Sequence, residues 1–205
     1  MMNTANIIDR YNLQNDDASE LSTDEELALA QEVYDDICNE RPWEWLKSTF
    51  TDVTSTTLPY IALPANFREF SQNKNGEIVV FVGNDYSEYK VIPFSSRRDY
   101  RNKSGFCYVD VVNSRLYFTL QPTSVMNIEF DYIRYAPSLT LSTEPLVTTD
   151  QFGNLIAYGM AVKFSNIEQA DKASGVSSYQ SENRVQYNNI LSDLRLQDSN
   201  LKIAM

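Results

Sequence analysis

The 205-residue chain contains no histidine and only two cysteines, Cys38 and Cys107. Histidine is the commonest general base and metal ligand near neutral pH, so its absence argues against an enzyme and excludes a Ser-His-Asp triad. Two cysteines without histidine cannot supply the four ligands of a zinc site of the Cys/His type. The two cysteines fall in different predicted elements, which favours buried thiols over a disulfide and fits a reducing compartment.

Glycine is also scarce, and long apolar runs are absent. The six glycines form neither GxGxxG nor GxxxxGK[ST], so no phosphate-binding motif is present. No apolar run approaches the ~20 residues that span a bilayer, and the first residues lack the basic and apolar regions of a signal peptide. We therefore expect no cofactor, no metal and no membrane partner. The 42% of hydrophobic residues is enough for the core of one domain.

The net charge of −11 is concentrated at the start of the chain. Residues 1–40 hold eleven acidic side chains and a single basic one, Arg10, whereas the remaining residues are nearly neutral. An acidic segment repels nucleic acid rather than binding it. Two interpretations stay open: a solvated helix face, or a surface that faces a basic partner or a DNA-conducting channel.

The N-terminal third of the sequence predicts an arm and then a helix. Residues 1–21 are polar and predict an arm that a partner would order. The capping-box sequence of residues 22–25 predicts a helix start, and Pro42 predicts its end. Trp43 and Trp45 are the only tryptophans, and we expect them to pack as a structural joint without a chemical role.

The middle of the chain reads as β structure. A hairpin is predicted around Asn113 and Ser114. The stretch from Val125 to Tyr132 alternates between apolar and polar residues, as expected for a strand with one solvated face. Helical periodicity returns after Asp150, and Gly159 lies inside its apolar stripe, which predicts close contact between helices.

These patterns predict an α+β fold: a helical module, made of an N-terminal helix and two C-terminal helices, with an inserted antiparallel β region. Residues 1–21 would form the N-terminal arm and residues 22–205 a single domain. The predicted parts of that domain are helical at 22–46 and 150–198, β-rich at 47–135, and a C-terminal tail at 199–205.

One basic cluster stands out in this acidic chain. Arg97, Arg98, Arg101 and Lys103 are interleaved with aromatic residues. The cluster could contact a phosphate backbone, or it could form an inter-subunit salt-bridge surface or a solvated turn. The acidic N-terminal helix is an available partner, either in the same chain or in a neighbour.

The C-terminal residues predict a docking segment. Leu194, Leu196, Leu201 and Ile203 cannot all pack on one face of a helix. Leftover apolar residues suggest docking on another chain, and the alternative is a frayed end.

The order of several short motifs resembles the head–tail adaptors of short-tailed phages, the connector ring below the portal. In chain order, the segments that carry the resemblance are Arg41-Pro-Trp-Glu-Trp-Leu46, Leu63-Pro-Ala-Asn-Phe67, Leu116 to Pro122, Tyr135 to Leu139, Leu155-Ile-Ala-Tyr-Gly159 and a final helix with Tyr187. The content of Asn, Ser and Tyr suits a phage of an AT-rich host, such as a crAss-like phage.

The resemblance implies a non-enzymatic virion protein, assembled in the host cytoplasm into a homo-oligomeric ring of twelve copies. The ring would join the portal to the tail, with the C-terminal segment on the portal and the β region facing the next tail component. DNA would pass through without specific binding. Two alternatives remain: another neck or tail subunit, such as a tail-tube or fibre-attachment protein, and a carboxylate-based hydrolase that uses Glu129 and Asp131.

Overall fold

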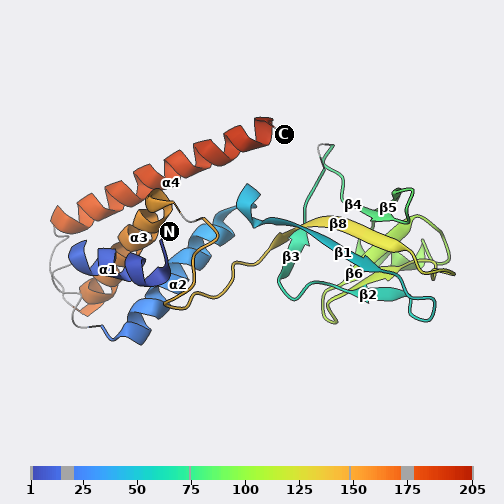
Figure 1. Ribbon diagram of the computed structural model, residues 1–205, viewed down its shortest axis with the longest axis horizontal. Coiled ribbons are helices and arrows are strands. Elements are labelled where there is room, and N and C mark those ends of the chain that lie inside the picture. The colour runs from blue at the N-terminus through green and yellow to red at the C-terminus, as the bar shows by residue number, and fades with distance from the viewer. Residues whose placement is uncertain (1, 15–20, 74, 148, 172–177, 205) are drawn as a thin grey trace. The chain divides into compact units, whose positions relative to one another are not determined.

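The computed structural model describes residues 2–14, 21–73, 75–147, 149–171 and 178–204, with side chains described outside 166–181 and 201–204 (Figure 1). The chain divides into two compact units. The terminal unit comprises Met1–Leu46 and Ala136–Met205, and the central unit comprises Lys47–Tyr135.

The terminal unit is built from helices. They are α1 (Thr4–Gln14), α2 (Thr23–Glu40), α3 (Asp150–Asp171) and α4 (Ser178–Ala204), with the 3₁₀ turn η2 (Glu44–Leu46) after α2. Helix α3 packs against each of the other three helices. Its residues Phe152, Leu155 and Met160 are fully buried, because α3 is apolar on most of its circumference.

Helix α2 begins at the predicted capping box. The Ser22 hydroxyl accepts the backbone N–H of Glu25, and the Glu25 carboxylate accepts the backbone N–H of Ser22 at 2.8 Å. The helix ends at Glu40, shortly before Pro42, as predicted.

Helix α1 lies inside the segment that was predicted to be an arm. Ile7, Ile8 and Tyr11 are buried, and the Tyr11 ring meets the Phe164 ring of α3 edge-on at 6.4 Å. An 11-residue helix is marginal by itself, so packing on α3 stabilises it. Residues 15–20 of the predicted arm lie outside the described residues.

Gly159 confirms the prediction of close helix contact. A methyl group at this position would lie 2.4 Å from Val33 Cγ1 of α2 and 3.0 Å from Tyr187 Cε2 of α4. Both distances are shorter than an ordinary carbon–carbon contact of about 3.5–4.0 Å. Glycine is therefore the residue that lets α2 and α4 approach α3 at this level.

The central unit is a single eight-stranded sheet (Figure 1). The strands are β1 (Lys47–Val53), β2 (Tyr60–Ala62), β3 (Phe67–Phe70), β4 (Val79–Val82), β5 (Ser87–Val91), β6 (Phe106–Asp110), β7 (Arg115–Phe118) and β8 (Asn127–Arg134). The 3₁₀ turn η3 (Phe94–Arg98) lies between β5 and β6. The strand order is β1-β8-β4-β5-β6-β7-β2, and β3 pairs with β8 as well.

Strand β8 organises this sheet. Along one side it pairs with β1 over seven residues, and along the other side it pairs with β4 near its start and with β3 near its end. Ile128, Phe130 and Tyr132 face the core, whereas Asn127 and Asp131 are exposed, so the predicted alternation is confirmed. The predicted hairpin is also present, as the antiparallel pair of β6 and β7.

The predicted fold class is wrong. The middle of the chain is a mixed sheet that curls nearly into a barrel, not an antiparallel region inserted into a module of three helices. Strands β5 and β6 run parallel, with Lys90 opposite Phe106 and Val91 opposite Cys107. The connection of residues 92–105, which includes η3, is long enough to turn the chain back for a parallel pairing. The helix α1 was also missing from the prediction.

The core of the central unit lies on the inner face of the curled sheet. It contains these buried side chains: Ile61, Leu63, Val80, Val82, Cys107, Leu116, Phe118, Ile128, Phe130 and Tyr132. Phe67 stacks on Tyr132 with ring centroids 5.8 Å apart, so the Leu63 to Phe67 motif contributes to this core. Among the described residues, no helix combines the length and the hydropathy that crossing a bilayer requires.

Candidate functional site

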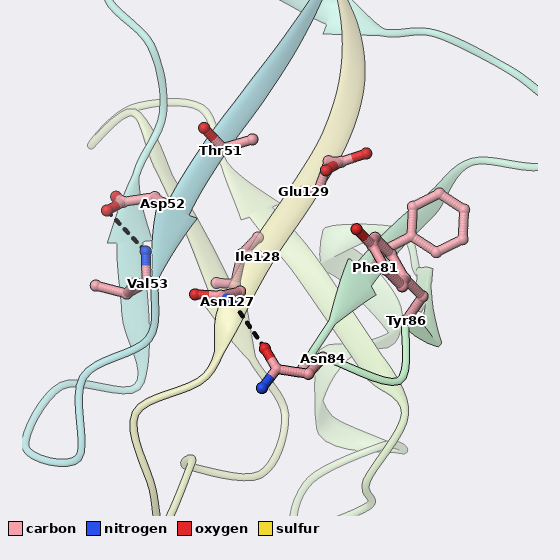
Figure 2. Close-up of a pocket in the computed structure, with 10 residues that line it drawn as sticks. Thr51, Asp52, Val53, Phe81, Asn84, Tyr86, Asn127, Ile128 and Glu129 are labelled. Carbon is pink, nitrogen blue, oxygen red and sulfur yellow. Dashed lines mark hydrogen bonds between the residues drawn. The ribbon is translucent and has the colours of Figure 1, made fainter.

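An open pocket of about 470 Å³ lies in the central unit beside β1, β8 and the β4–β5 turn (Figure 2). Its lining comprises Thr51, Asp52, Val53, Phe81, Gly83, Asn84, Tyr86, Asn127, Ile128 and Glu129. Phe81 pairs with Glu129 and Thr51 pairs with Glu129 across the strands, so these three side chains share the outer face of the sheet.

The pocket is acidic, and side-chain hydrogen bonds are present in its lining. The Asn127 side chain donates to Asn84 Oδ1 at 2.9 Å, and the Val53 N–H donates to Asp52 Oδ1 at 2.8 Å (Figure 2). Two carboxylates and no basic side chain line it. Such a surface disfavours phosphate and other anions.

The two carboxylates that a hydrolase would use, Glu129 and Asp131, lie in different surroundings. Glu129 lines the pocket, whereas Asp131 lies outside it and accepts a hydrogen bond from Thr49 Oγ1 at 2.7 Å. Of this pair, only Glu129 faces the pocket, where the other carboxylate of the lining is Asp52.

Trp43 and Trp45 lie in the terminal unit, around η2. Trp43 is fully buried, and its Nε1–H donates to the carbonyl of Ile37 at 2.6 Å. The two indoles stack with centroids 4.3 Å apart, and Trp45 meets Phe152 of α3 edge-on at 5.9 Å. The pair is part of the packing between the end of α2 and α3.

Arg41 completes this arrangement with a partner that sequence reasoning missed. Its guanidinium lies 5.1 Å from the Trp43 ring centroid and 3.3 Å from Asp198 Oδ2 of α4. The Asp198 side chain is fully buried, and its other oxygen accepts the N–H of Glu44 at 2.7 Å. We call Arg41, Trp43, Trp45 and Asp198 the tryptophan cluster.

The predicted basic cluster lies on η3 and the turn that follows it. The Arg97 guanidinium lies 3.9 Å from the Phe94 ring centroid, and its Nη1 donates to the Phe94 carbonyl at 2.8 Å. Lys103 Nζ lies 5.0 Å from the Tyr100 ring centroid, and Arg98 and Arg101 are exposed. Among the described residues, none of the four basic side chains forms an ion pair.

The structure separates the four apolar residues that were predicted to dock on another chain. Leu194 is buried within the terminal unit, whereas Leu196 is 65% exposed. Leu201 and Ile203 lie within α4, but their side chains are outside the described residues. Leu194 therefore belongs to the core, and Leu196 is the described residue available to a partner.

Two loops at one end of the central unit expose apolar side chains that the sequence analysis did not single out. They are Val53, Leu58, Leu120 and Val125, with 45–65% of each side chain exposed. We call them the apolar loop end. Thr54 donates to the Met126 carbonyl at 2.8 Å and Gln121 donates to the Thr56 carbonyl at 2.7 Å, so the two loops are held together.

Within the described part of the chain, no group of three or more potential ligands is placed to hold a metal ion. No protein-family model matches the chain, and comparison with curated proteins finds none that is similar in sequence.

Proposed function

We propose that the protein is a structural virion subunit that forms a ring between portal and tail, joins the head to the tail and lines the DNA exit channel. The proposal assigns no catalytic role to any side chain. It rests first on the order of motifs that resembles phage head–tail adaptors.

The packing of those motifs is consistent with the proposal. Arg41, Trp43 and Trp45 of the first motif tie α2 to α3 and α4. Leu116 and Phe118 are buried in the central core, and Gly159 admits two neighbouring helices. These three motifs have a packing reason, as expected of a protein whose task is assembly and not chemistry.

Beside the order of motifs, the apolar loop end is the structural observation that supports the proposal. Apolar side chains gathered on one exposed edge are typical of surfaces that a partner covers. The mutually hydrogen-bonded loops hold these side chains on one end of the central unit. A downstream ring or tail component is the partner that the proposed function supplies for this end.

The distribution of charge also favours a DNA conduit. The central unit has ten basic and nine acidic residues, a net charge of +1, which leaves −12 for the terminal unit. A strongly acidic surface does not retain DNA, because counterion release favours only contacts with basic side chains.

The test is the mass of the particle formed by the full chain, alone and mixed with the portal protein of its own genome. The expected result is a closed ring of about twelve copies, seen by native mass spectrometry and negative-stain microscopy. A chain that stays monomeric in both samples would contradict the proposal. Open filaments or tubes that form without portal would instead favour the tail-tube alternative.

A further inference from the structure

The outer face of β2, β7 and β6 carries a row of aromatic rings. Tyr60, Tyr117 and Tyr108 stand directly opposite one another across these strands, so their side chains project from the same face. The Tyr108 and Tyr117 rings are nearly parallel, at 6° and 5.3 Å, and Tyr60 lies 5.1 Å from Tyr117. Phe94 of η3 extends the row at 5.8 Å from Tyr108.

A guanidinium group covers the ring at each end of the row. Arg97 lies 3.9 Å from the Phe94 centroid, and Arg115 lies 4.1 Å from the Tyr60 centroid. A hydrogen bond with Tyr117 raises the pKa of Arg115 above its already high value. The cationic ends of the row are therefore permanent at any physiological pH.

Three further basic residues, Arg98, Arg101 and Lys103, follow Phe94 and Arg97 closely along the chain. We call the row and these bases the basic aromatic face. Residues 94–119 hold five bases and two acids, Asp99 and Asp110, so the face has a net charge of +3. This surplus is an exception in a chain whose net charge is −11.

The arrangement of the rings favours a protein partner over a nucleic acid. The nucleobases of a single-stranded nucleic acid stack on aromatic side chains whose ring faces are open. Here Tyr117 lies between Tyr108 and Tyr60, and Arg97 and Arg115 cover the end rings, so the row offers few open faces. Tyrosine and arginine, with tryptophan, are enriched among the residues that dominate the binding energy of protein interfaces.

The chain itself carries an acidic surface of complementary charge. Helix α2 exposes five acidic side chains: Asp24, Glu25, Glu32, Asp36 and Glu40. Lys163 pairs with Glu32 and Asp36, at 2.5 and 2.7 Å, and Arg195 pairs with Glu40 at 2.6 Å. Two bases thus offset five acids, which leaves an excess of three negative charges against the +3 of the basic aromatic face.

We propose that the basic aromatic face of one copy binds the acidic side of α2 in the next copy. The inference rests on the proposed ring and names its subunit interface. Two different surfaces of the same chain make a head-to-tail contact, and repetition of such a contact closes a ring when the rotation permits it. The opposite charges would steer the copies together and set their register.

Two charge-reversed variants test the interface. The face variant is Arg98→Glu with Arg101→Glu, at exposed side chains that make no described ion pair. The helix variant is Asp24→Lys with Ala28→Lys, at exposed positions on α2. Without the other variant, each should assemble only at a protein concentration about tenfold or more above that of the wild type, whether or not portal is present. The reason is that like charges then meet at the interface.

An equimolar mixture of the two variants provides the decisive result. In a head-to-tail ring each altered surface can then meet the altered surface of opposite charge, so alternating copies should restore assembly near the wild-type concentration. The control variant Arg98→Lys with Arg101→Lys keeps the charges and should assemble like the wild type. Circular dichroism and thermal melting show whether every variant is folded.

Two outcomes would overturn the inference: either variant assembles like the wild type, or the folded mixture stays dissociated. If a face variant that assembles normally also loses binding to a fluorescent single-stranded oligonucleotide, the face is assigned to nucleic acid instead. Both outcomes leave the ring intact as a proposal, whereas a wild-type chain that is monomeric even with portal overturns the proposed function itself.

Discussion

Arg41 Nη2 of the terminal unit lies 3.3 Å from Asp198 Oδ2, whose side chain is fully buried. The two residues lie far apart in the sequence and join the end of α2 to α4. Asp198 also accepts the backbone N–H of Glu44 through its other oxygen, so a single buried carboxylate fixes both a side chain and a turn. A buried charge with two partners is costly to break, because the group left behind loses both its water and its partner.

The first prediction concerns this carboxylate. Asp198→Ala should lower the free energy of unfolding by about 3–5 kcal/mol, since it leaves the N–H of Glu44 and the Arg41 guanidinium without their buried acceptor. Urea denaturation followed by tryptophan fluorescence measures the change. The exposed Asp193→Ala on the same helix should change stability by about 0.5 kcal/mol or less. Equal losses for the two variants would refute the role assigned to Asp198.

The second prediction concerns Gly159. Gly159→Ala gains about 1 kcal/mol of helix propensity, but its methyl group would lie 2.4 Å from Val33 Cγ1. Overpacking costs about 1–3 kcal/mol, so the substitution should be destabilising overall. Thermal unfolding measures it. In a Val33→Ala background the same substitution should cost less, and identical costs in the two backgrounds would show that Val33 is not the obstacle.

The third prediction is a pH dependence from Cys107. Burial raises the pKa of this thiol from 9.0 to about 12. Above about pH 9 the unfolded chain loses the thiol proton while the folded chain keeps it, so the free energy of unfolding should fall as pH rises. The slope contributed is up to about 1.4 kcal/mol per pH unit between pH 9 and 12.

A Cys107→Ala variant isolates that contribution. Tyrosine and lysine titrate in both proteins, so their contributions cancel in the stability difference between wild type and variant. The loss of the Cys107 contribution should make this difference shrink from pH 7 to pH 10.5, as measured by urea denaturation. The native thiol should also react slowly with a disulfide reagent at pH 8, because its thiolate fraction there is about 10⁻⁴. A constant difference in stability together with rapid native labelling would contradict the assigned burial.

The fourth prediction concerns the capping box. The side-chain hydrogen bond with Ser22, together with the backbone hydrogen bond, lowers the pKa of Glu25 below 4.5. The hydrogen bonds favour the charged form, so their stabilisation is present above pH 4.5 and is lost as pH falls through the lowered pKa. Ser22→Ala should cost about 1 kcal/mol at pH 7 and return the pKa of Glu25 toward 4.5.

Carboxyl chemical shifts followed through an acid titration by NMR check this last expectation. Ser192→Ala, at an exposed hydroxyl of α4 that bonds to its own helix, serves as the matched control and should leave the titration of Glu25 unchanged. A Glu25 titration that Ser22→Ala does not move would rule out the hydrogen bond as the cause.

Features that depend on neighbouring residues could be predicted from the sequence. The start of α2 follows from Ser22 and Glu25, and the face of β8 follows from its strict alternation. Gly159 was recognisable because a glycine inside an apolar stripe needs a packing reason. In each case the signal lies within a single helix or strand, so it does not depend on the rest of the fold.

Features that depend on distant pairing could not be predicted. Helix α1 is too short and too polar to be recognised from its sequence. Ile7 and Tyr11 become core residues only when α1 packs on α3. The parallel pairing of β5 and β6 is a property of the whole sheet. Asp198 looks like any surface aspartate in sequence. The basic residues at 97–103 could be recognised in the sequence. The aromatic row of the basic aromatic face could not, because it depends on the register of β2, β7 and β6.

The two units differ in whether they are continuous in the sequence. The central unit is one continuous stretch, Lys47–Tyr135, whereas the terminal unit combines Met1–Leu46 with Ala136–Met205. During synthesis on the ribosome, the sheet can therefore form while α1 and α2 still lack α3, the helix on which both pack. Until α3 emerges, the apolar sides of α1 and α2 stay open to chaperones and to other nascent chains. The central sheet can therefore be complete before α1 and α2 reach their final packing, and the proposed basic aromatic face would form before the proposed acidic side of α2.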